Sequence, residues 1–61
     1  MYRIVILLEP GYSIKVASHD DVTIEKDISD DGSAVWTLEH DKIFTVFIQN
    51  GNVRIGTLTA G

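Results

Sequence analysis

Apolar and polar residues alternate in short runs along the chain, and no stretch keeps the 3.6-residue period of an amphipathic helix. The runs are rich in valine, isoleucine, threonine and aromatic residues, and glycine, asparagine, aspartate or serine separates them. This pattern predicts six β-strands, near residues 2–8, 12–17, 22–28, 34–39, 43–49 and 53–59. We therefore expect a single all-β domain over residues 1–61.

The segment "SDDGSA" predicts a hairpin with a three-residue loop, residues 30–32. Such a loop ends on a residue in the left-handed conformation, which Gly32 adopts without a steric penalty. This loop length places Ile24 opposite Leu38 and Lys26 opposite Trp36. A two-residue loop would instead mix apolar and acidic residues on each face.

Two further turns predict the pairing of the remaining strands. Asn50-Gly51 suits a two-residue type I′ turn, and residues 40–42 suit another three-residue loop. The expected pairs are Trp36 with Val46, Leu38 with Phe44, and Val46 with Ile55.

These registers give a four-stranded meander with one continuous apolar face. Pro10-Gly11 suits a wide corner, so we expect the first two strands to fold across this meander. The expected fold is a small antiparallel meander of five to six strands that closes into a barrel or orthogonal sandwich, SH3-like or OB-like in shape. The expected core comprises Tyr2, Ile4, Ile6, Leu8, Ile14, Val16, Val22, Ile24, Ile28, Ala34, Trp36, Leu38, Phe44, Val46, Ile48, Val53 and Ile55.

Several apolar residues point away from this core in the expected register. Val35 would lie across from Phe47, and Ile43 across from Leu58, so the group would be contiguous. Contiguous apolar surface on a small protein marks an interface. An alternative is that Arg54 covers the ring of Phe47. The expected interface comprises Val5, Leu7, Val35, Ile43, Phe47, Arg54 and Leu58.

The size of the chain favours a second subunit. A chain of 61 residues buries a small share of its surface, and it has no cysteine for a disulfide or a thiolate metal site. A homodimer would supply the missing buried area.

The charge of −4 is unevenly distributed. The five basic residues are spread singly along the chain, which disfavours nucleic-acid binding, because phosphate contacts need clustered bases. The acidic surface comprises Asp20, Asp21, Glu25, Asp27, Asp30 and Asp31.

Two histidines lie beside aspartates in the sequence, and the expected register brings them to the same end of the sheet. Imidazole and carboxylate together suit zinc or another divalent ion. Solvent-exposed loop residues are the simpler interpretation, so the sequence predicts no cofactor. The weak candidate for a metal site comprises His19, Asp21, His40 and Asp41.

The sequence therefore predicts a non-enzymatic, acidic protein-interaction domain that self-associates and acts as an accessory or inhibitory binder of a larger protein. One alternative is an acidic mimic of nucleic acid that occupies the groove of a DNA-binding protein. Another is a small barrel that binds single-stranded nucleic acid. No secretory or membrane-spanning segment is apparent, so we expect a cytoplasmic protein without membrane contact.

Overall fold

Six antiparallel β-strands make up the fold, and the computed structural model describes residues 1–61. None of its segments is a helix that could cross a membrane. The strands are β1 (Tyr2–Leu8), β2 (Tyr12–Val16), β3 (Thr23–Ile28), β4 (Ala34–His40), β5 (Phe44–Asn50) and β6 (Val53–Ala60).

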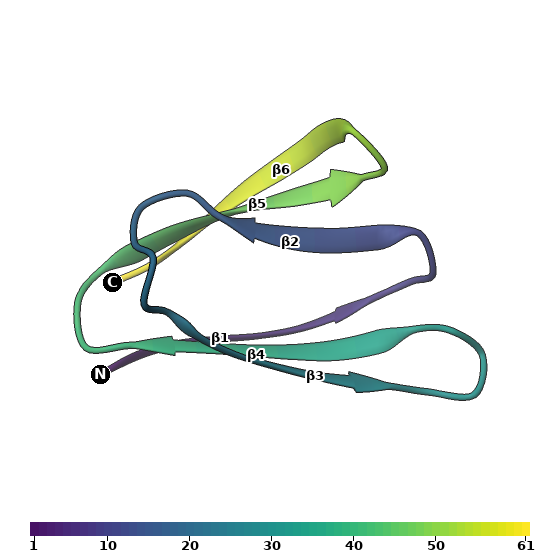
Figure 1. Ribbon diagram of the computed structural model, residues 1–61, viewed down its shortest axis with the longest axis horizontal. Helices are drawn as coiled ribbons and strands as arrows, with labels where there is room; N and C mark the ends of the chain where they lie inside the picture. The colour runs from purple at the N-terminus through teal and green to yellow at the C-terminus, as the bar shows by residue number, and fades with distance from the viewer.

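The strands form two three-stranded sheets. Sheet A has the order β1-β4-β3, and sheet B has the order β2-β5-β6. Figure 1 shows sheet B above sheet A, with the β1–β2, β3–β4 and β5–β6 turns at one end. The β2–β3 and β4–β5 connections and both termini lie at the other end, which we call the connection end.

One apolar core is shared by the two sheets. Along β4 the buried residues Ala34, Trp36 and Leu38 alternate with residues that face outward, as expected for a strand with one buried face. Sheet B contributes Phe44 and Val46, both completely buried. The buried core comprises Leu8, Ala34, Trp36, Leu38, Phe44, Val46 and Ala60, with Ile4, Ile6, Tyr12, Ile14, Val16, Val22 and Ile48 packed around it.

The predicted β3–β4 hairpin is confirmed, residue by residue. Ile24 pairs with Leu38 and Lys26 pairs with Trp36. Gly32 has a φ of 86°, in the left-handed region, as the three-residue loop requires. The Lys26 ammonium lies 4.8 Å from the Trp36 ring centroid, so its charge sits over the edge of the core.

The predicted β4–β5 hairpin is wrong, although the up-and-down β course is confirmed. Leu38 does not pair with Phe44, and Trp36 does not pair with Val46, because β4 and β5 belong to different sheets. β1 pairs with β4, and β2 pairs with β5. Residues 41–43 therefore pass from one sheet to the other, and no closed barrel forms.

The predicted β5–β6 register is also wrong. The turn residues are Gly51 and Asn52, and only Gly51 has positive φ, which matches a type II′ turn. A bulge follows at Ile55, since Gln49 pairs with Arg54 but Ile48 pairs with Gly56. One extra residue reverses the faces of the strand beyond it.

The bulge brings Leu58 opposite the buried Val46, not to the outer face where the sequence placed it. The edges of the core are also more open than expected, because each sheet ends after three strands. Five residues predicted in the core are exposed at these edges: Tyr2, Ile24, Ile28, Val53 and Ile55.

Candidate functional site

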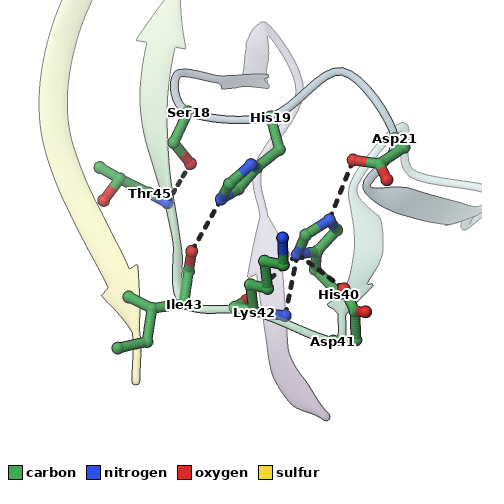
Figure 2. Close-up of polar contacts among 8 residues, drawn as sticks. All are labelled: Ser18, His19, Asp21, His40, Asp41, Lys42, Ile43 and Thr45. Carbon is green, nitrogen blue, oxygen red and sulfur yellow. Dashed lines mark hydrogen bonds and ion pairs between the residues drawn. The ribbon is translucent and has the colours of Figure 1, made fainter.

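Two histidines and an aspartate meet at the connection end of the molecule. His40 is the last residue of β4, and its side chain is buried, with 5% of its surface exposed. His19 and Asp21 come from the β2–β3 connection, which passes over the end of β4 (Figure 2). We call these three residues the histidine cluster.

The His40 ring is held between two sets of polar groups. Its Nε2 lies 2.9 Å from Asp21 Oδ1, and on the other side its Nδ1 lies 3.0 Å from the Lys42 amide nitrogen. The Lys42 carbonyl oxygen is 3.2 Å from the same Nδ1, and Asp41 Oδ1 is 3.4 Å from it. Neutral His40 accepts from the Lys42 amide, whereas protonated His40 donates to the Lys42 carbonyl.

These contacts shift the acid–base behaviour of both partners. Burial lowers the pKa of His40, but the hydrogen bonds to Asp21 and the Lys42 carbonyl outweigh it, so this pKa is raised. The hydrogen bond from His40 in turn lowers the pKa of Asp21. The geometry therefore favours an imidazolium–carboxylate pair at the end of β4.

His19 stacks on His40 and is anchored separately. The two rings are 4.4 Å apart between centroids and 13° from parallel. His19 Nε2 donates to the Ile43 carbonyl oxygen at 3.0 Å, which leaves Nδ1 as the lone-pair nitrogen of the neutral ring. Hydrogen bonds from the Thr45 amide to Ser18 Oγ and from the Ala17 amide to the Thr45 carbonyl fix this connection against β5.

The structure brings together three of the four residues proposed for a metal site. One ligand atom from each of His19, Asp21 and His40 lies within 4.8 Å of the others. Asp41 lies beside Nδ1 on the opposite side of the His40 ring, so it is not grouped with the ligand atoms of His19, Asp21 and His40 (Figure 2). The carbonyl groups of Lys42 and Ile43 complete the surroundings, and backbone acceptors of this kind leave no signal in the sequence.

The predicted interface residues are not contiguous. Val5, Leu7 and Val35 lie together on the outer face of sheet A, where Leu7 pairs with Val35. Phe47 is half-buried on sheet B, where it pairs with Lys15 and Thr57. The expected contact between Val35 and Phe47 is therefore wrong.

The other members of that set are scattered. Ile43 is exposed in the β4–β5 connection and does not pair with Leu58, whose partner is Val46. Arg54 lies with its Cζ 4.4 Å from the Phe47 ring centroid, as the alternative interpretation expected. The turn at Gly51 and Asn52 moves its strand pairing to Gln49 but keeps it on the outer face.

The six residues of the predicted acidic surface are all exposed, and they are divided between the two ends of sheet A. Asp20 and Asp21 lie at the connection end, and Asp30 and Asp31 lie in the β3–β4 turn. Glu25 and Asp27 lie on β3 between them. β3 is therefore an edge strand with acidic residues along its length and at both ends.

A shallow apolar cavity of about 300 Å³ opens at the end of the molecule opposite the histidine cluster. The sequence did not indicate it, because Leu8, Ile48 and Ile55 were assigned to a closed core and Leu7 to the outer face. It is lined by Leu7, Leu8, Glu9, Tyr12, Ile48 and Ile55.

No family model, curated protein or solved structure matches this chain.

Proposed function

We propose that this chain is a non-enzymatic protein-interaction domain that self-associates by pairing β1 with β1 of a second copy. The observation that supports this most directly is the character of β1. It is an edge strand of seven residues, hydrogen-bonded on one side to β4. A long apolar edge is a template for strand addition, because its outer amide and carbonyl groups have no ladder partner.

The residues of β1 offer little protection against such pairing. Ile4 and Ile6 face the core, while the side chains of Val5 and Leu7 face solvent, with 61% and 65% of each residue exposed. Arg3 is the one charged residue of the strand, and its guanidinium is bonded to Glu39 at 2.9 Å. The strand contains no lysine, no proline and no second charge, which are the usual means of preventing another strand from pairing with an edge.

The charges on the two edge strands of sheet A favour self-association through β1 rather than through β3. Glu25 and Asp27 make β3 acidic, and pairing two such strands would bring like charges together. An antiparallel pair of β1 strands would instead build a continuous six-stranded sheet with the two β3 strands at its far ends. Val5, Leu7 and Val35 of both copies would then form one apolar outer surface.

Sedimentation equilibrium on the wild-type chain and on Leu7→Lys tests this proposal. The wild type is expected to form dimers at micromolar concentration, and the added charge on an edge strand should weaken association at least tenfold. Ser13→Lys is the matched control, because Ser13 lies on an edge strand of sheet B and its substitution should leave the association constant unchanged. A circular dichroism spectrum establishes that each variant keeps its β structure.

Amide hydrogen exchange locates the contact. Association through β1 should slow exchange in residues 2–8 as the protein concentration rises, with no such change in residues 23–28. A wild type that stays monomeric at high micromolar concentration, or protection confined to β3, β2 or β6, would contradict the proposal.

A further inference from the structure

The donor atoms of the histidine cluster point to a metal site rather than to a simple ion pair. One ligand atom each from His19, Asp21 and His40 lies within 4.8 Å of the others at the connection end, and His40 Nε2 faces Asp21 Oδ1 at 2.9 Å (Figure 2). The geometry points to a binding site for a divalent transition ion, Zn²⁺ in the first place, with these three side chains as ligands. Two imidazoles and one carboxylate form a donor set that suits zinc and leaves a fourth tetrahedral position open to solvent.

Both histidines already have the outer partners that a metal-bound imidazole needs. A metal-ligating histidine donates its other ring N–H to a carbonyl or carboxylate, which fixes the tautomer and the ring orientation. His19 Nε2 donates to the Ile43 carbonyl at 3.0 Å, so its Nδ1 keeps the lone pair that a metal would bind. For His40, the Lys42 carbonyl at 3.2 Å and the Asp41 carboxylate at 3.4 Å can accept from Nδ1, and this replaces the bond that the Lys42 amide donates to neutral Nδ1 at 3.0 Å.

The proton changes on binding follow from these contacts. The proton now shared between His40 Nε2 and Asp21 leaves that nitrogen, and the metal takes the lone pair in its place. If His40 begins as imidazolium, this proton is released to solvent and the Nδ1–H bond to Lys42 remains. If His40 begins neutral with its proton on Nε2, that same proton moves to Nδ1, where the Lys42 carbonyl accepts it and the bond from the Lys42 amide is lost; no proton is then released to solvent.

The rearrangement required falls on the β2–β3 connection, where the His19 ring must turn out of its stack with His40 to aim Nδ1 at the ion. Ligands 2.0–2.1 Å from zinc in a tetrahedron are about 3.3 Å apart, so the present separations of up to 4.8 Å must shorten. Asp21 is exposed and His19 is half-buried, and both belong to a connection without strand pairing. His40 is held in place by the strand pairing of β4, so His19 and Asp21 would move towards His40 when the ion binds.

Such a site would join the β2–β3 connection to the end of β4. The chain has no cysteine and therefore no disulfide to perform this task. A small domain gains more from a structural metal than a large one, because its core alone supplies little net stability. Bound zinc would close the connection end while leaving the β1 edge free.

Isothermal titration of the tag-free chain with Zn²⁺ tests the assignment. We expect one ion per chain, and Co²⁺ as a substitute should give the visible absorption of a tetrahedral centre. Zinc at one hundred times its Kd should raise Tm by about 10 °C or more. Asp21→Asn and His19→Gln should each weaken zinc binding at least tenfold.

Asp20→Asn is the matched control, because it removes the same charge from the neighbouring residue, which is outside the cluster. It should bind zinc as the wild type does. Histidine NMR adds a readout that does not depend on stability: zinc should shift His19 Nδ1 and His40 Nε2, and leave the other ring nitrogens protonated. The absence of saturable binding up to millimolar zinc, or binding that Asp21→Asn and His19→Gln leave intact, would overturn the site.

Discussion

Arg54 covers the ring of Phe47 on the outer face of sheet B, with its Cζ 4.4 Å from the ring centroid. The two residues are not strand partners: Arg54 pairs with Gln49 next to the turn, and Phe47 pairs with Thr57 beyond the bulge at Ile55. The guanidinium reaches diagonally and shields an aromatic ring that would otherwise be more exposed. Phe47 is therefore a poor interface residue, and the proposed contact surface lies on the other sheet.

This contact predicts a measurable coupling between the two side chains. Arg54→Ala should reduce the free energy of unfolding by about 0.5–1 kcal/mol, because an exposed cation–π contact has about this strength. In a double-mutant cycle with Phe47→Leu, the loss caused by Arg54→Ala should shrink towards zero. Urea denaturation measures each variant, and equal losses in both backgrounds would show that the contact is not formed. Phe47→Leu should leave self-association unchanged.

Leu38 and Ile24 are strand partners with very different burial, which yields a second prediction. Leu38 is completely buried, whereas 46% of Ile24 is exposed at the edge of sheet A. Leu38→Ala should cost about 2–5 kcal/mol, enough to unfold a domain of this size, while Ile24→Ala should cost about 1 kcal/mol. Thermal unfolding followed by circular dichroism compares them. Equal losses of stability in the two variants would mean that Ile24 is as deeply buried as the sequence pattern predicted.

The sequence predicted the strands and, except on β6, the inward faces well, because both depend on local signals. Period-two alternation identifies strands, and Gly32 determines one hairpin register through its left-handed backbone. It also placed Trp36 inside and Phe47 outside, as observed. The histidine cluster was foreseen for the same reason, since the β3–β4 register brings the β2–β3 connection beside His40.

The division into two sheets could not be predicted from local pattern. A short polar loop such as residues 40–42 is compatible with a hairpin and with a crossing between sheets, and in both cases Leu38 and Phe44 point into one core. The long-range pairs decide between them, namely β1 with β4 and β2 with β5. The β5–β6 turn was placed one residue early because Asn-Gly admits more than one turn position, and separately the bulge at Ile55 was missed. That error moved Leu58 to the wrong face.

Two glycines in different backbone conformations supply a third prediction. Gly32 has positive φ, and a Cβ there would lie 3.2 Å from Pro10 Cγ. Gly32→Ala should therefore destabilise the protein by about 1–2 kcal/mol. Gly56 has ordinary strand geometry with open space around it, so Gly56→Ala should be neutral or stabilise by up to about 1 kcal/mol. Urea denaturation of the two variants gives the comparison, and a tolerated Gly32→Ala would argue against the three-residue loop.

Asp31 predicts how the stability of the β3–β4 turn depends on pH. Its Oδ1 accepts from the Ser33 hydroxyl at 2.6 Å and from the Ser33 amide at 2.9 Å. The hydroxyl bond is the main cause of a lowered pKa for Asp31, with the amide bond next. A carboxyl whose pKa is lower in the folded state stabilises that state above its unfolded pKa of 3.8, and the contribution disappears as pH falls through the folded pKa.

Asp31→Asn keeps an oxygen acceptor for Ser33 but removes the charge. It should therefore lower the urea midpoint at pH 7, and the difference from wild type should diminish as pH falls below 3.8 and the wild-type carboxyl protonates. Asp30→Asn makes the same charge change at the adjacent exposed position, which has no side-chain hydrogen bond to Ser33. It should have the smaller effect at pH 7. Urea midpoints are measured from pH 7 to pH 2. If the midpoint of Asp31→Asn stays below that of the wild type at pH values under the folded pKa of Asp31, the variant loses stability through altered hydrogen-bond geometry rather than through the lost charge.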